Sequence, residues 1–377
     1  MYGDLPEDHS HCVTFKKITN VSVNDFIDLS TYLLFEILRR KDRKKIELFA
    51  TAFARIESTY GSNTIRNFLD AISISLDNGK SWLQQHSQYY GDITEEYFEQ
   101  SPLMRFPLIK MGDTYLIISD DLLKTALSTF VADVLRNYDT QWFMREFGSM
   151  YEELLNTSLS SIGVDFVTED ELVQHFGHRK GRKFVDFVVS DKGCNIFIEA
   201  KGVSLRWDVM VTDIPEKIAA RSETSIEKGI RQAYNLAANV LPGTTIEGIE
   251  FGTGDNYLLL VTFKDTYLCN GQFYFNNIDS VVIDEIIANE GKGDLIPLSH
   301  IFFISVDELE ILLGAVAHGP KTLSEWLAAA VDNREMLIPE PKLRREITQK
   351  NEEIKFTPLI RETFADLFKR VEKKAAQ

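Results

Sequence analysis

Cysteine is scarce in this chain of 377 residues. The three thiols, Cys12, Cys194 and Cys269, lie far apart, and none belongs to a C-x-x-C pair. Isolated cysteines in odd number exclude a disulfide framework and a zinc ribbon, and they fit a reducing compartment. Long apolar runs are missing too, since no stretch approaches the roughly 18 consecutive apolar residues of a membrane helix. The N-terminal residues carry no secretory signal pattern. We therefore expect a cytoplasmic protein with no membrane contact.

Positive charge is also in short supply. The chain has 41 Lys and Arg against 57 Asp and Glu, a net charge of −16. Proteins that coat nucleic acid non-specifically need an excess of Lys and Arg, so that class is excluded, whereas an enzyme with a local basic groove is not.

Several familiar site signatures are incomplete. Asn78-Gly79-Lys80-Ser81 ends like a phosphate-binding loop, but Ile74 stands where the first glycine belongs. His9, His11 and Cys12 have the side chains of a metal site, but so close to the N-terminus we expect a loose end instead.

The chain shows no internal repeat and no low-complexity tract, and its length predicts two or three domains. Apolar spacing predicts a mostly helical first domain, residues 1–140, with two short strands near 106–109 and 115–118. We expect a second domain at 141–318 and a helical C-terminal appendage at 319–377. The helices expected in the first two domains cover 25–40, 44–57, 62–76, 121–136 and 141–162.

From residue 164 the pattern becomes rich in strands, which predicts an α/β domain with a mixed sheet flanked by helices. Ser305 and Glu308 have the spacing of a capping box for a helix over 306–316. The apolar runs 257–263 and 300–305 indicate inner strands that are buried on both faces. The other expected elements are strands at 164–168, 183–190 and 195–201, and helices at 224–240, 322–331 and 357–374.

The most informative segment is 181–201, where two apolar strands flank Asp191-Lys192-Gly193. A turn cluster between such strands predicts a hairpin with a loop over 191–194, which brings residue 186 opposite residue 199. In this register Asp186, Glu199 and Lys201 point to one face of the sheet. Opposed carboxylates repel each other, and burying them is costly unless a positive charge shares the site. Hard oxygen ligands of this kind suit Mg²⁺ or Mn²⁺.

The acid-x-Lys triplet alone carries little information, because six such triplets occur in the chain. Of these, only the one at Glu199 ends a predicted buried strand with an acidic partner one hairpin arm away. An incidental ion pair between Glu199 and Lys201 at a sheet edge is the structural alternative.

Asp186, twelve intervening residues and then Glu199-Ala200-Lys201 resemble the PD-(D/E)xK nuclease superfamily over residues 141–316. The resemblance implies a restriction-endonuclease-like fold. It also implies that Asp186 and Glu199 hold a Mg²⁺ or Mn²⁺ ion and that Lys201 orients water or stabilises charge at the phosphorus. Val185 occupies the position at which the motif has the proline that gives it its name.

The resemblance implies further site residues outside the hairpin. A helix before it commonly adds a carboxylate, for which Glu152 is the candidate metal ligand and Glu153 the fallback; a solvated helix face is the alternative. A later helix often carries Lys or Gln toward the phosphate, which Lys228 and Gln232 match. The basic cluster just before the hairpin is the remaining candidate for phosphate contact, and its members are Arg179, Lys180, Arg182 and Lys183.

The resulting hypothesis is a magnesium-dependent endonuclease that hydrolyses DNA and acts in bacterial restriction or anti-phage defence. Its size and its N-terminal region before the core resemble the Shedu-type defence nucleases. A catalytically inactive nuclease-fold module for nucleic-acid binding or complex assembly is the alternative. A third hypothesis is a helical scaffold protein whose N-terminal residues, about 140 of them, bind a partner. It is compatible with both the nuclease and the inactive module. We expect the N-terminal helical region to bind a second copy or a protein partner.

Overall fold

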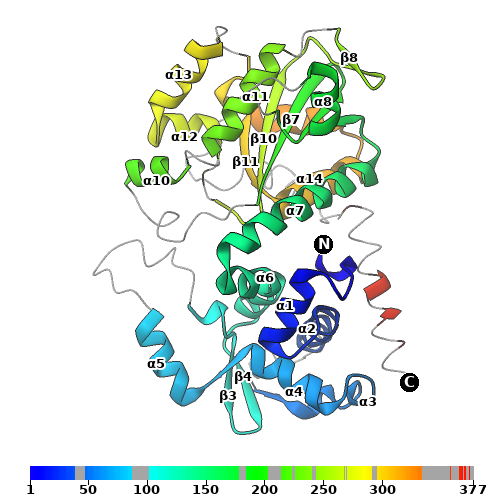
Figure 1. Cartoon of the computed structure of the whole chain (residues 1–377), viewed down its shortest axis with the longest axis vertical. Coiled ribbons are helices and arrows are strands. Elements are labelled where there is room, and N and C mark those ends of the chain that lie inside the picture. Colours follow the sequence, from blue (N-terminus) through cyan, green and yellow to red (C-terminus); the bar gives the residue numbers. More distant parts are fainter. Residues whose placement is uncertain are drawn as a thin grey trace. The chain divides into compact units, whose positions relative to one another are not determined.

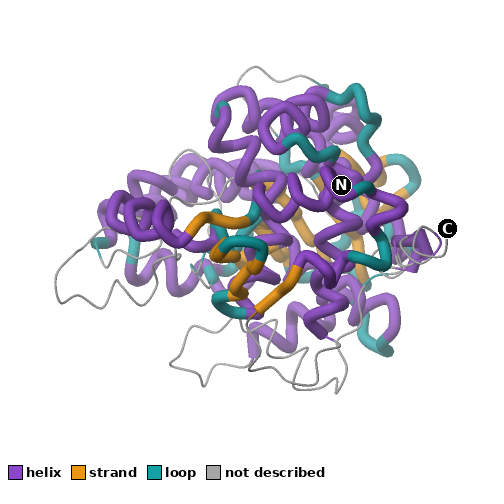
Figure 2. The backbone as a smooth tube through the Cα atoms, turned by 90° about the horizontal axis from the view of Figure 1, so that it is seen from below, coloured by secondary structure: helices purple, strands orange, loops and turns teal. Residues whose placement is uncertain are grey.

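The computed structural model forms two compact units, residues 1–146 with 363–377, and residues 147–362. The division falls inside helix α7 (Thr140–Ile162). Phe143 packs on His11 in the first unit, whereas Phe147 packs on Phe263 in the second. Figure 1 labels the elements, and helical segments dominate the backbone trace in Figure 2. The structure describes residues 1–38, 47–86, 102–177, 184–202, 214–222, 226–239, 243–266, 268, 270–290, 295–332, 357, 365–367, 369–370 and 373.

The first unit combines helices with a four-stranded sheet of order β1-β4-β3-β2. A cluster of buried aromatic rings forms its core, with Phe26 stacked on Phe130 and packed edge-on against Phe15 and Phe68. Its strands are β1 (Glu47–Phe49), β2 (Ser73–Ser75), β3 (Leu108–Met111) and β4 (Thr114–Ile117). Its helices are α1 (Ser10–Thr19), α2 (Val23–Leu38), α3 (Glu57–Tyr60), α4 (Ser62–Ala71), α5 (Leu76–His86) and α6 (Asp120–Tyr138), with short 3₁₀ turns η1 (Tyr2–Asp4), η2 (Ala50–Phe53) and η4 (Pro102–Met104).

The prediction of a loose N-terminal end was wrong. His11 lies in α1 with no exposed surface, and the rings of Tyr2, Trp142 and Phe143 pack around it. These rings explain the ordered start, because aromatic packing and burial offset the entropy that a chain end loses on folding.

The second unit contains a five-stranded mixed sheet of order β11-β10-β7-β6-β5. β7, β10 and β11 run parallel, whereas β5, β6 and β7 form an antiparallel meander. As the apolar runs predicted, β10 and β11 are almost wholly buried, but only β10 is an inner strand, because β11 lies at the edge of the sheet. The strands are β5 (Phe166–Thr168), β6 (Phe187–Asp191), β7 (Cys194–Lys201), β10 (Asn256–Thr262) and β11 (Ile301–Ser305), with a separate small pair β8 (Thr245–Ile246) and β9 (Ile249–Glu250).

Helices pack against this sheet. α11 contacts β7 and β10, and α14 contacts β10 and β11. The capping box predicted at Ser305 and Glu308 is present, since the serine hydroxyl accepts the Glu308 N–H and the Glu308 carboxylate accepts the Ser305 N–H. The helices are α8 (Glu169–Phe176), α10 (Pro215–Ser222), α11 (Lys228–Asn239), α12 (Gly271–Asn277), α13 (Ser280–Glu290), α14 (Val306–His318) and α15 (Leu323–Asp332), with a 3₁₀ turn η6 (Leu298–His300).

The hairpin of β6 and β7 has the expected register, with Ser190 paired to Asn195. Its loop is shorter than the expected 191–194, because Asp191 also pairs with Cys194. The two remaining residues, Lys192 and Gly193, both have positive φ, 49° and 80°. Such turns match the right-handed twist of the strands that they join.

Within the described residues, no helix combines the length and the apolar character that crossing a bilayer requires.

In the first unit, a residue near the C-terminus makes a buried polar contact. Arg370 donates from Nε to Oδ1 of Asp28 at 2.9 Å, and the Tyr60 hydroxyl donates to Oδ2 at 2.8 Å. The Asp28 side chain has no exposed surface. The C-terminal residues of this unit are therefore joined to its core through a buried carboxylate.

Replacing Arg370 by Ala removes the guanidinium that faces the Asp28 carboxylate. The Arg370 side chain is 40% exposed, so water compensates for part of the lost interaction. We expect the free energy of unfolding in urea to fall by about 1–3 kcal/mol, less than for a fully buried pair. Arg145→Ala is the control, because its partner Glu146 is only a surface contact and its loss costs under about 1 kcal/mol. Equal losses in both variants would contradict this assignment.

Candidate active site

The two carboxylates and the lysine meet where β6 and β7 lie side by side. The ladder ends at the pair of Phe187 and Ile198, so Asp186 lies directly before β6 and Glu199 directly after Ile198 in β7. The two carboxylates are near enough for the charge of Glu199 to raise the pKa of Asp186. The N–H of Ala200 donates to Oδ2 of Asp186 at 2.6 Å, which places the aspartate side chain against the backbone of β7.

Lys201 forms an ion pair with Glu199. Its Nζ donates to Glu199 Oε1, and the two side chains are 14% and 3% exposed. The second glutamate oxygen, Oε2, is buried and has no hydrogen-bond partner. A buried acceptor without a donor is costly, so this oxygen is a place where a cation or a proton would stabilise the protein.

Burial makes both carboxyl groups hold protons more tightly. Desolvation, followed by repulsion from Glu199, raises the pKa of Asp186 to about 8, against the stabilising N–H of Ala200. Desolvation also raises the pKa of Glu199 to about 7, although the Lys201 ammonium opposes that rise. One ammonium therefore does not fully compensate two buried carboxylates.

Two more carboxylates act on this pair. Glu152 is an exposed residue of α7, and its charge raises the pKa of Asp186. Glu169, the first residue of α8, raises the pKa of Glu199, and its N–H donates to the Asp186 carbonyl at 2.8 Å. Sequence reasoning missed Glu169. The available signal was the capping box of Thr168 and Glu171, which places Glu169 at a helix start directly after β5.

The residues expected to contact nucleic acid do not share one environment. Lys228 is exposed in the first turn of α11. Gln232 is buried, and its Nε2 donates to the Phe184 carbonyl at 2.6 Å, so it holds the segment that leads to Asp186. The members of the basic cluster lie outside the described residues; they are Arg179, Lys180, Arg182 and Lys183.

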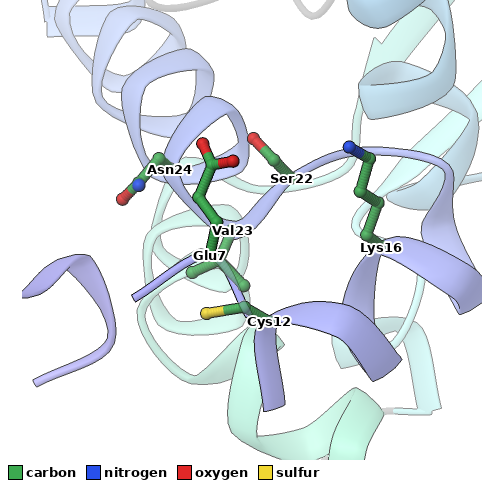
Figure 3. Close-up of a pocket in the computed structure, with 6 residues that line it drawn as sticks. All are labelled: Glu7, Cys12, Lys16, Ser22, Val23 and Asn24. Atoms are coloured by element: carbon green, nitrogen blue, oxygen red, sulfur yellow. The ribbon is translucent and has the colours of Figure 1, made fainter. Parts of the chain in front are cut away.

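No preformed metal cage accompanies the carboxylate pair in the described part of the chain, where no three His, Cys, Asp or Glu side chains gather around one point. A small pocket of about 40 Å³ belongs to the first unit, and Figure 3 shows Cys12 and Lys16 among its lining residues. It has room for little more than water, so it is no substrate site.

Comparisons with family models, with curated proteins and with solved structures found no match to this chain.

Asp186→Asn should stabilise the metal-free protein, and increasingly so at higher pH. The raised pKa means that the folded protein keeps the Asp186 proton while the unfolded chain releases it, so stability falls as pH rises from about 4 to about 8. An amide carries no charge and avoids this loss. We expect a gain of at least about 1 kcal/mol at pH 8, or roughly 2–4 °C in Tm.

The measurement is thermal unfolding in EDTA at pH 5 and pH 8. Asp165→Asn is the matched control, because Asp165 is an exposed residue of the same unit and the same substitution there relieves no burial. A destabilised Asp186→Asn variant at pH 8 would mean that Asp186 is a structural anion.

Proposed function

We propose that this protein is a Mg²⁺- or Mn²⁺-dependent endonuclease that hydrolyses DNA phosphodiester bonds, with a restriction-endonuclease-like domain at residues 141–318. The observation that carries the proposal is the buried pair of Asp186 and Glu199 beside Lys201. A mixed sheet with helices packed against it supports this fold class. A role in bacterial restriction or anti-phage defence follows from the resemblance of the motif.

The residues present fit a divalent cation. Glu199 offers a buried oxygen that no donor occupies, and Asp186 adds a second hard oxygen ligand next to it. Mg²⁺ typically takes one or two carboxylates and completes its shell with water and substrate oxygens, so two ligands suffice. Glu152 is the candidate for a third. When bound, such an ion would polarise the phosphodiester and acidify a water molecule.

The protein's own groups have separate tasks. Lys201 lies at the end of β7, largely buried, where its ammonium can donate to a phosphate oxygen and stabilise the negative charge that develops there. The low exposure of the site strengthens this interaction by excluding water. The N–H of Ala200 holds the Asp186 carboxylate in one orientation, so the ligand is positioned before substrate arrives.

The test is cleavage of supercoiled plasmid and linear DNA in Mg²⁺, in Mn²⁺ and in EDTA. Lys201→Ala and Glu199→Gln should each lower the cleavage rate at least about 100-fold, because electrostatic stabilisation and metal ligation are lost. Lys217→Ala, at an exposed position of α10, should cut like wild type. Cleavage by Lys201→Ala at the wild-type rate would exclude the assigned site. DNA binding without any cleavage would favour the inactive-module alternative.

Productive cutting should also need a second copy or a protein partner that pools local basic patches. At a net charge of −16, we expect the isolated chain to bind DNA weakly. What binding there is depends on local Lys and Arg contacts to phosphates, so it should decline steeply with salt. Fluorescence anisotropy of labelled DNA between about 50 and 200 mM salt measures this, alongside the oligomeric state. Tight, salt-insensitive binding by a monomer would refute the expectation.

A further inference from the structure

Helix α11 rests directly on the Glu199–Lys201 ion pair. The contact is made by Gly229, the second residue of the helix, which is buried. A Cβ atom added there would lie 2.6 Å from Leu260 Cδ2, 3.1 Å from Glu199 Cγ and 3.3 Å from Lys201 Cε. These three side chains therefore occupy the space in which any other residue at position 229 would place its side chain.

The three neighbouring side chains differ in how easily they can move. Leu260 has no exposed surface, and the Glu199 side chain is 3% exposed, so both are held by the core. Lys201 is 14% exposed and has a long, flexible side chain. A side chain at position 229 would therefore displace the Lys201 stem or lift the first turn of α11 from the sheet.

Helix formation does not favour glycine at this position, because alanine is the better helix former. The feature that requires glycine here is the close approach of α11 to Leu260 and to the Glu199–Lys201 pair.

We propose that Gly229 is a positioning residue, which keeps the Lys201 ammonium on Glu199 by leaving no side chain between α11 and the pair. This inference rests on the proposed nuclease function for its catalytic consequence. The placement of Lys201 itself can be measured without any substrate.

The first experiment compares Gly229→Ala with Gly148→Ala. Gly148 is also a helical glycine of this unit, but a Cβ there meets no atom within 4 Å. Each protein is labelled with trace acetic anhydride in EDTA, and mass spectrometry reads the rate at Lys201. We expect several-fold faster acetylation of Lys201 in Gly229→Ala, because the ammonium leaves its buried partner. Gly148→Ala should label like wild type.

Plasmid cleavage in Mg²⁺ supplies the second readout. A displaced lysine should lower kcat of Gly229→Ala about 10- to 100-fold with little change in KM for DNA, since the lysine acts on the reacting phosphate. If wild type cuts no DNA, the nuclease proposal fails, while the labelling result still decides the role of Gly229. If wild type cuts and Gly229→Ala labels and cuts like it, only the positioning inference is overturned.

The double variant Gly229→Ala/Leu260→Val separates positioning from core packing. Valine lacks the Cδ2 atom that makes the closest contact, so the fold has room even if Gly229→Ala alone fails to fold. We expect normal circular dichroism with Lys201 still labelled faster than in wild type. Restoration of wild-type labelling would show that Gly229 serves only to fit Leu260, and would overturn the proposal.

Discussion

The burial of two carboxylates beside one ammonium is the constraint on which the second unit's site depends. Removing an ion from water costs several kcal/mol unless partners replace the lost hydration. Lys201 neutralises one charge, and the Ala200 N–H satisfies one oxygen of Asp186, but Glu199 Oε2 has no donor. The folded protein therefore retains an electrostatic cost at this point that a further positive charge would remove. Such uncompensated groups are typical of functional sites rather than of structural ion pairs.

The backbone around Asp186 shows how the fold holds this arrangement. Asp186 precedes β6, so its position depends on contacts from several elements. The Ala200 N–H binds its side chain, the Glu169 N–H binds its carbonyl, and Gln232 binds the Phe184 carbonyl two residues earlier. Glu199 and Lys201 need less support, because β7 lies between two hydrogen-bonded neighbours. Strand β7 thus provides a rigid half of the site, and α8 and α11 fasten the other half to it.

Local patterns predicted several parts of the structure that depend on neighbours in the chain, although the helix expected at 44–57 was wrong, because Glu47–Phe49 form β1 and Ala50–Phe53 a 3₁₀ turn. The period-two alternation and the turn cluster specified the hairpin register, and the Ser305–Glu308 spacing specified a helix start. The predictions were incomplete where distant segments approach each other. Glu169 approaches the carboxylate pair only because α8 follows β5, and the core role of Gln232 depends on how α11 lies on the sheet. Likewise, α12 and α13 were not anticipated, and His11 is ordered by rings more than 130 residues away.

The pairing of Lys201 with Glu199 also explains how such a site is compatible with a stable fold before any cation binds. The ammonium contacts one oxygen of the glutamate and so offsets part of its burial cost. It can do so only while its stem stays against β7, and Gly229 of α11 packs directly on that stem. A lysine held in this way stabilises the metal-free protein and is already in place to meet a phosphate. The same contact therefore serves both folding and the proposed chemistry, which links the position of α11 to the position of the reacting charge.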